Sequence, residues 1–338
     1  MEIKRIAIDT SKHVFTLYGV DEREQPVLRR ELKRSQVEPF FAKQAPTEVV
    51  LEACGGAHHW GRRLASLGHR VRLIPPQYVK PFVKRSKNDR NDGLAISEAA
   101  ARPSMRFVPV KSAQAQADAM LLSVRELLVK QRTQLVNALR GHATEFGVVV
   151  AKGVGHAAHL IERLEADATI PAAAREMAAF LGAQIAELDQ RLAELDRKLV
   201  ALHKAMPISR LLAEVPGIGP IGATTLALTV DPSAFRSGRH FAAWVGLTPK
   251  ENSTGGKQRL GGISRQGNER LRQLLVLGAT SVIKVAKPGN KHASAWLLGL
   301  LGRRPRRVAA VALANKMARI VWAMMTSGEA YRPVPVQA

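Results

Sequence analysis

The first 76 residues alternate apolar runs with turn-like and helical stretches, and this order constrains the fold more than any other feature. Tight connections join the first three runs, whereas helical stretches separate the later ones, as expected for strands. Three consecutive strands followed by alternating helix and strand predict a mixed α/β sheet. The five runs span residues 3–9, 13–20, 26–34, 47–53 and 69–76.

Acidic residues stand where the strands of this sheet end and where a later helix starts. Asp9 closes the first strand and Glu52 closes the fourth. Asp89 and Asp92 lie three residues apart, before or within the first turn of a helix that continues through GLAISEAAA. Strand ends and helix starts gather at one edge of an α/β sheet, so we expect the four carboxylates to meet there and hold Mg2+. For the SKNDRND stretch alone, a capped helix with a solvated charge run is the alternative.

The charge balance predicts a polyanionic partner. With 51 Lys and Arg against 28 Asp and Glu, the chain has a formal net charge of +23, which favours salt-dependent binding to nucleic acid. Aromatic residues make up only 5%, so base stacking is not expected to dominate that binding. No membrane contact is expected, because neither a signal peptide nor an apolar run of about 18 residues stands out. The single cysteine, Cys54, favours a reducing cytoplasm.

Residues 113–206 form a predicted helical region between an N-terminal domain at 1–112 and a C-terminal domain at 207–330. The stretch 121–147 is long and amphipathic. A later stretch has apolar residues at alternating steps of three and four, which is typical of a coiled coil. An ordinary bundle helix is the alternative, because the apolar seam lasts under three heptads. The seam comprises Ile185, Leu188, Leu192, Leu195, Leu199 and Leu202.

The C-terminal domain opens with LLAEVPGIGPIGATTLALTV, which contains a glycine pattern shared with dinucleotide-binding folds. No βαβ unit surrounds it and the expected acidic residue is missing, so that function is excluded. A helix, a GIG turn and a second helix predict a helix-hairpin-helix instead. Its Gly217 and Gly219 would let backbone amides approach a DNA phosphate. A tight helical turn without a ligand is the alternative.

A basic, glycine-rich loop follows within residues 246–275. Ser253 precedes Thr254 and two glycines. The glycines would leave the hydroxyl exposed and let another backbone approach it closely. Lys257, Arg259 and Arg265 follow closely and can neutralise a phosphate. From these residues alone, a loop that grips phosphate is favoured over a nucleophile.

Several of these motifs together resemble a known enzyme family. IDTSKHVF, VVLEACGG and KNDRND resemble the DEDD catalytic domain of insertion-sequence transposases, which has a RuvC-like, RNase H-type fold. VPGIGP, FAAWVGLTP, NSTGGKQRLGGISRQGN and LRQLL resemble the C-terminal domain of the serine-assisted DEDD transposases, the bridge-RNA-guided recombinases. The two matches jointly cover most of the chain.

The resemblance implies a DNA recombinase that mobilises its own element. Asp9, Glu52, Asp89 and Asp92 would be the catalytic metal ligands, and Ser253 the nucleophile that joins them in one active site, in cis or in trans. Thr254 stands where many relatives have a second serine, so Thr254 remains an alternative nucleophile, as does Ser264. A noncoding guide RNA and a homo-oligomer, dimer or tetramer, are also implied.

The residues alone, without the resemblance, leave two other functions open. The first is a metal-dependent junction-resolving nuclease that uses only the acids. The second is a basic architectural protein that binds nucleic acid without cutting it, in which the acids are helix caps and turns.

Overall fold

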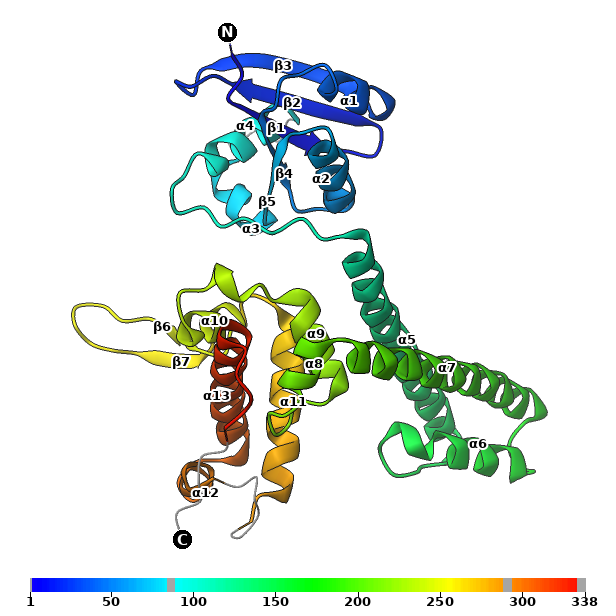
Figure 1. The fold of residues 1–338 in the computed structure, drawn as a ribbon. Coiled ribbons are helices and arrows are strands. Elements are labelled where there is room, and N and C mark those ends of the chain that lie inside the picture. Colours follow the sequence, from blue (N-terminus) through cyan, green and yellow to red (C-terminus); the bar gives the residue numbers. More distant parts are fainter. Residues whose placement is uncertain (1, 84–88, 288–293, 333–338) are drawn as a thin grey trace. The chain divides into compact units, whose positions relative to one another are not determined.

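The computed structural model describes residues 2–83, 89–287 and 294–332, with residues 89–91 described by their backbone alone (Figure 1). The chain divides into two compact units, Met1–Ala117 and Asp118–Ala338. The predicted helical region 113–206 and the predicted domain 207–330 lie almost wholly in the second unit.

The first unit is built on a five-stranded sheet with the order β3-β2-β1-β4-β5. β1 pairs antiparallel with β2, and β2 with β3, whereas β4 is parallel to β1 and β5 is parallel to β4. This arrangement confirms the mixed α/β sheet and is consistent with an RNase H-like fold. The strands are β1 (Arg5–Thr10), β2 (Val14–Val20), β3 (Pro26–Lys33), β4 (Glu48–Glu52) and β5 (Arg70–Ile74).

Helices cover both faces of this sheet because alternate strand residues are apolar on each side. On one face, Ile6 and Ile8 of β1 pack with helices α1 (Arg34–Phe41) and α2 (Ala57–Ser66). On the other face, Ala7 packs with α4 (Asp89–Ala100) and with the short helix α3 (Pro76–Val79), which η1 (Lys80–Phe82) follows.

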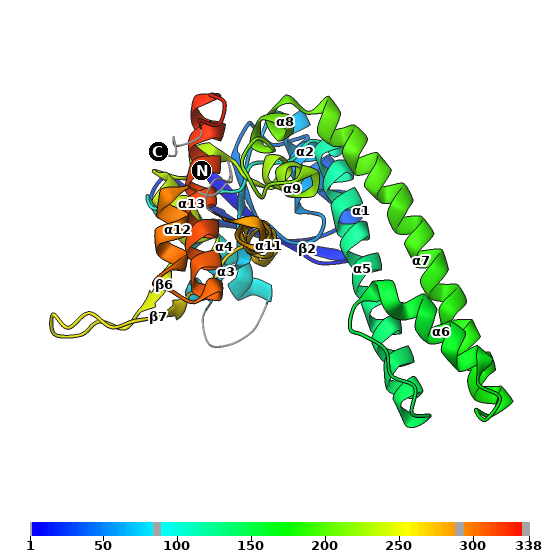
Figure 2. The ribbon, with the colours of Figure 1, turned by 90° about the horizontal axis from the view of Figure 1, so that it is seen from below.

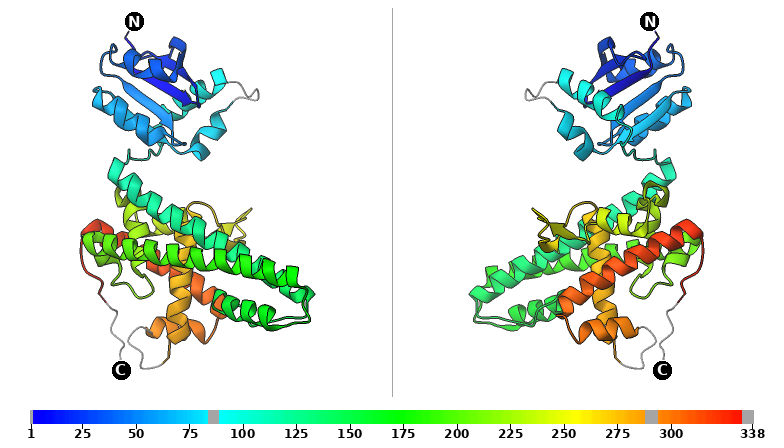
Figure 3. Two further views of the ribbon diagram at one scale, coloured as in Figure 1. Left: turned by 90° about the vertical axis from the view of Figure 1, so that its right-hand side faces the viewer. Right: turned by 90° about the vertical axis from the view of Figure 1, so that its left-hand side faces the viewer.

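The second unit is mostly helical and starts with long helices, as the sequence predicts. Figures 2 and 3 show α5 (Ala113–Glu145) and α7 (Ala172–Ala205) side by side, joined through η2 (Val154–His156) and α6 (Ala157–Ala166). The remaining elements are α8 (Pro207–Leu212), α9 (Pro220–Thr229), η3 (Pro232–Ala234), α10 (Gly238–Trp244), β6 (Pro249–Glu251), β7 (Leu260–Ile263), α11 (Glu269–Val285), α12 (Ala295–Leu301) and α13 (Arg306–Ser327).

Helices α5 and α7 run antiparallel, as their ion pairs show. Arg125 on α5 pairs with Asp196 on α7, and Arg132, one heptad later, pairs with Asp189, one heptad earlier. The seam residues Ile185, Leu192 and Leu199 are buried within the chain, and the three other seam leucines are partly buried. The apolar seam therefore packs inside the monomer, and a coiled coil between subunits remains a prediction.

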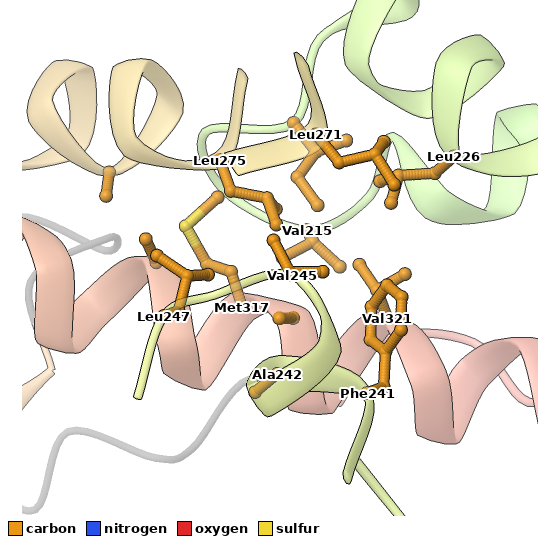
Figure 4. Close-up of a cluster of buried hydrophobic side chains, with 14 of the residues drawn as sticks. Val215, Leu226, Phe241, Ala242, Val245, Leu247, Leu271, Leu275, Met317 and Val321 are labelled. Carbon is orange, nitrogen blue, oxygen red and sulfur yellow. The ribbon is translucent and has the colours of Figure 1, made fainter. Parts of the chain in front are cut away.

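One hydrophobic core of the second unit lies between the C-terminal helices (Figure 4), and another lies between α5, α6 and α7. Phe241 of α10, Leu271 and Leu275 of α11, and Met317 and Val321 of α13 meet there. By length and composition alone, α13 is apolar enough to cross a membrane, which corrects the expectation that the chain has no such run. Its buried side chains belong to this core, as in the core helix of a soluble protein.

Candidate active site

Asp9 and Glu52 lie at the same level of two neighbouring parallel strands. The ladder between β1 and β4 pairs the residues directly before them. Because side chains alternate along a strand, Asp9 shares a face with Ala7, and Glu52 shares a face with Val50. Ala7 and Val50 both pack with α4. Both carboxylates are therefore on the face of the sheet that α4 covers.

The start of α4 lies directly against β2 at Gly93. A Cβ atom at this glycine would lie 3.1 Å from Tyr18 Cβ and 4.0 Å from the Thr16 carbonyl oxygen. Thr16 is opposite Asp9 in the ladder between β1 and β2. Gly93 thus allows the first turn of α4, with Asp92 in it, to approach the strand next to Asp9. This role of Gly93 was not predicted, although the Asp-Gly pair at a helix start was a signal for it.

Burial and the charge on α4 both change the pKa of the Glu52 carboxyl. Burial raises the pKa of Glu52, and the neighbouring Asp92 carboxylate raises it further. Glu52 and Asp92 are thus brought close together from distant parts of the sequence. Crowded carboxylates favour a hard divalent cation, which neutralises their repulsion, so the donor set fits such a metal.

The fourth predicted ligand, Asp89, is the first residue of α4, but its side chain lies outside the described residues. Among the side chains that the structure does describe, no three Asp, Glu, His or Cys residues form a complete metal-binding cluster. The metal role of all four acids therefore remains a prediction.

Cys54 and His58 follow Glu52 in the sequence, but their hydrogen bonds are to residues other than the four predicted metal ligands. Cys54 Sγ lies 3.1 Å from Thr10 Oγ1, next to Asp9. His58 is on α2, which covers the opposite face of the sheet, and its Nδ1 accepts a hydrogen bond of 3.1 Å from the Lys111 backbone N–H. Burial lowers the pKa of His58, and the Lys111 and Arg62 charges lower it further. A neutral His58 therefore anchors the segment that follows β5 and α4.

Ser253 lies on an exposed β-hairpin, residues 249–263, which we call the serine arm. β6 and β7 pair at its base, and the bridge between Thr254 and Lys257 closes its tip. At that tip Gly255 and Gly256 have φ of +57° and +76°, the left-handed pair required by a tight hairpin turn. All residues from 251 to 260 are exposed.

The Ser253 hydroxyl has a carboxylate acceptor on its own strand. Its Oγ donates to Glu251 Oε1 at 3.0 Å, and the Arg259 backbone N–H donates to Oγ at 3.2 Å. Glu251 was not among the predicted site residues. Its only signal was its place two residues before Ser253, on the same side of an extended strand. The arrangement offers a hydroxyl, a proton acceptor and nearby cations in one exposed segment.

Two glycines close the base of the serine arm. A Cβ atom on Gly267 would lie 1.7 Å from the Trp244 carbonyl oxygen, and one on Gly246 would lie 2.2 Å from that of Gln266. Both glycines have left-handed φ. Part of the glycine pattern is therefore explained by chain packing.

The remaining predicted residues of this loop divide between tip and base. Lys257 and Arg259 are exposed on the arm with Ser253. Ser264 is partly buried at the base, where its N–H donates to the Thr248 carbonyl at 2.8 Å, and the exposed Arg265 follows with φ of +55°. Of the three candidate nucleophiles, Ser253 and Thr254 are the exposed ones.

The GIG turn joins α8 and α9, two short helices that pack on each other. Gly217 has a left-handed φ of +90° and lies against Gly278 of α11. Gly219 is exposed, with open space around the position of a Cβ atom. Packing alone accounts for Gly217, so a phosphate contact is better sought at Gly219.

The acids lie in the first unit and the serine arm in the second. A common active site for the two remains a prediction.

Comparison with known proteins gives the family. Residues 209–294 match the Transposase IS116/IS110/IS902 family, and residues 6–147 match a DEDD transposase family. The "Putative transposase y4pF/y4sB" of Sinorhizobium fredii is 54% identical to this chain, and the match covers 100% of this chain and 88% of the relative. The "Transposase for insertion sequence element IS1111A" of Coxiella burnetii is 39% identical, and the match covers 98% of this chain and 92% of the relative. The chain therefore belongs to the IS110/IS116/IS902 family, whose members join an N-terminal DEDD domain to a C-terminal transposase domain, and it is a transposase that transfers phosphoryl groups on DNA to mobilise an insertion sequence.

Proposed function

We propose that this transposase cuts and rejoins DNA at the ends of its element with a divalent-metal site and a serine nucleophile. Asp9, Glu52, Asp89 and Asp92 would hold Mg2+, the hard cation suited to carboxylate oxygens. The observation that carries this proposal is the placement of Asp9 and Glu52 at neighbouring strand ends, on the sheet face against which α4 brings Asp92. When bound, the metal stabilises charge on the phosphate and helps to ionise a hydroxyl.

Ser253 would conserve the energy of the broken phosphodiester bond. Its Oγ attacks the phosphorus, the Oγ–P bond forms, and the P–O bond to the departing strand end breaks. That end leaves as a hydroxyl and takes up a proton. The hydroxyl of a new strand then attacks the phosphoserine ester, which restores the DNA backbone and frees the serine.

Glu251 is the proposed acceptor of the Ser253 proton, because their hydrogen bond of 3.0 Å is already formed on the arm. The phosphate would be held by Lys257, Arg259 and Arg265, which are exposed around the same hairpin. Gly219 would contribute a backbone contact to DNA without reading sequence.

The proposed partners are the DNA of the element ends and target, and a noncoding guide RNA. The formal net charge of +23 supports binding to both polyanions. The proposed location of the reaction is the cytoplasm. A homo-oligomer, dimer or tetramer, is part of the proposal, with the serine arm supplied in cis or in trans. Sequencing of RNA that co-purifies with the protein tests the guide, and its absence from every active preparation would remove the guide from the proposal.

The nucleophile is tested with three single variants of the full chain and a labelled DNA of element ends. Ser253→Ala should abolish the covalent protein–DNA adduct and strand exchange but leave DNA binding intact. Thr254→Val and Ser264→Ala are the matched controls and should retain the adduct. An adduct that persists in Ser253→Ala and vanishes in either control would move the nucleophile.

The carboxylates are tested with Asp9→Asn and Glu52→Gln, which preserve size and remove charge. Both should abolish cleavage without weakening DNA binding. Unchanged cleavage in both would exclude the metal site. Hydrolysed ends without any adduct in the unaltered protein would favour the junction-resolving nuclease.

A further inference from the structure

A groove of about 1360 Å³ lies in the second unit at the base of the serine arm. Most of its lining comes from the start of α10, the arm residues Pro249 and Gly261–Ile263, Trp296 of α12, and one side of α13. The groove therefore continues directly from the hairpin that carries Ser253.

Among the residues that the structure describes, four cations line this groove and no Asp or Glu does. They are Arg239, Arg307, Lys316 and Arg319. Elsewhere many arginines pair with carboxylates, as Arg125 does with Asp196. Within the part of the chain that the structure describes, none of the four groove cations has a carboxylate partner. The groove is thus complementary to an anion.

The walls between these cations are apolar. Trp296 is 38% exposed and Val308 is 52% exposed, so both present apolar surface to the groove. The Lys316 ammonium lies 4.5 Å from the centre of the Trp296 ring and places a cation beside an aromatic face. A ligand that fits must combine flat apolar faces with negative charges.

Close backbone packing holds two of the cations together. A Cβ atom on Gly238 would lie 3.0 Å from the Arg319 carbonyl oxygen, so α10 starts directly on α13. Arg239 follows Gly238 in the chain and therefore lies next to Arg319 across this contact. The cationic side of the groove is built by the fold and not by a loose surface loop.

We infer that this groove binds an unpaired stretch of the DNA strand that Ser253 cuts, with a base against Trp296 and phosphates at the four cations. A single strand offers base faces together with phosphates, whereas a duplex hides the base faces in its stack. The inference rests on the proposed function, because it takes DNA as the strand handled beside the serine arm.

The test measures binding of full-length protein to fluorescent oligonucleotides by anisotropy, in EDTA so that no cleavage occurs. The probes are a thymidine single strand of about 12 nucleotides, a duplex of equal length, and a uridine RNA of equal length. Arg307→Gln combined with Arg319→Gln should weaken single-strand binding about tenfold and lower the salt slope by roughly 1.4, at about 0.7 per phosphate. Duplex binding should change less than threefold.

Arg303→Gln combined with Arg304→Gln is the matched control, because these exposed arginines precede α13 and do not line the groove. The control should leave the single-strand affinity within about twofold. Equal losses in both double variants, or equal losses for single strand and duplex, would show a general electrostatic surface and overturn the inference. Losses confined to the RNA probe would assign the groove to RNA and also overturn it.

Trp296 supplies a second readout. Trp296→Ala should weaken single-strand binding about tenfold and reduce the quenching of tryptophan fluorescence by DNA, whereas Trp296→Phe should bind within about threefold of the unaltered protein. If Trp296→Ala fails to fold, Trp296→Phe and the arginine pair decide. Because cleavage is not needed, groove binding can fail while the Ser253 adduct persists, and the adduct can fail while groove binding persists.

Discussion

Gly217, in the turn before α9, and Gly278, on α11, are in direct backbone contact. A Cβ atom on Gly217 would lie 2.6 Å from the Gly278 carbonyl oxygen, and one on Gly278 would lie 2.0 Å from that of Gly217. Each glycine therefore admits the backbone of the other, and the GIG turn is fixed to the core helix α11. The two glycines of this turn serve different purposes, because only Gly219 faces open space.

Alanine substitutions should separate these purposes. Gly217→Ala adds a methyl group where φ is +90° and a carbonyl stands in the way, so it should cost about 2–4 kcal/mol of unfolding free energy. Gly219→Ala should leave stability within about 1 kcal/mol and reduce affinity for DNA of any sequence. Chemical denaturation and anisotropy check the two effects. Equal stability of both variants would contradict the packing role of Gly217.

Gly93 should couple the position of α4 to catalysis. Gly93→Val places a branched side chain where a Cβ atom is already 3.1 Å from Tyr18 Cβ, so α4 must move away from β2 and carry Asp92 with it. We expect about 1–3 kcal/mol lower stability and a loss of DNA cleavage greater than the loss of DNA binding. Gly141→Val is the control, since that glycine of α5 has open space around it. Full cleavage by Gly93→Val would separate Asp92 from the active site.

Glu251 should accelerate adduct formation if it accepts the Ser253 proton. Glu251→Gln keeps an oxygen acceptor for the 3.0 Å hydrogen bond but removes the basic carboxylate, so the rate should fall about 100-fold with unchanged DNA binding. Single-turnover quantification of the adduct measures this rate. A rate equal to that of the unaltered protein would reduce Glu251 to a support of the hairpin.

His58 should make the first unit less stable in mild acid. Burial holds the folded pKa of His58 below the ordinary value of 6.5, so the unfolded chain takes up the proton first as the pH falls. The unfolding free energy should therefore be constant above about pH 6.5 in this respect and decrease below it. His58→Gln should flatten the pH dependence of the urea midpoint, whereas His159→Gln, at an exposed site on α6, should not. An unchanged slope in His58→Gln would contradict the prediction.

The apolar seam of α7 should stabilise the monomer. Leu192 is 4% exposed, so Leu192→Ala should cost about 2–5 kcal/mol at every protein concentration, without a change in oligomeric state. Val200→Ala, at a position 39% exposed on the same helix, should change stability by about 0.5 kcal/mol or less. A cost for Leu192→Ala that depends on concentration, measured by thermal denaturation and sedimentation, would assign the seam to a subunit interface.

Most of the first unit could be predicted from the sequence because its information is local. Apolar runs of strand length separated by turns and helices defined the sheet, and the ends of two runs placed Asp9 and Glu52. That Asp9 and Glu52 lie at the same level of neighbouring strands was also predictable in outline, since parallel strands end at one edge of a sheet. The close approach of α4 to β2 at Gly93 could not be predicted, because it depends on which strand α4 crosses.

The second unit was harder to predict because its signals need tertiary partners. The glycine pattern around Gly217 predicted a phosphate contact, but it could not predict the packing of Gly217 on Gly278, some 60 residues away. The serine arm has no alternation of apolar and polar residues, since it buries neither face, so its strands had no periodicity to detect. The partner of the α7 seam was equally hidden, because a heptad pattern does not say whether the opposing helix belongs to the same chain.

The serine arm holds Ser253 on a hairpin without any buried residue between positions 251 and 260. A two-stranded hairpin with no core is marginally stable in water, so contacts with a bound strand must supply the rest of its order. Latency follows from this construction. If Ser253 is the nucleophile, as we propose, it would react only once a bound strand orders the arm, so random encounters with DNA would leave that DNA uncut.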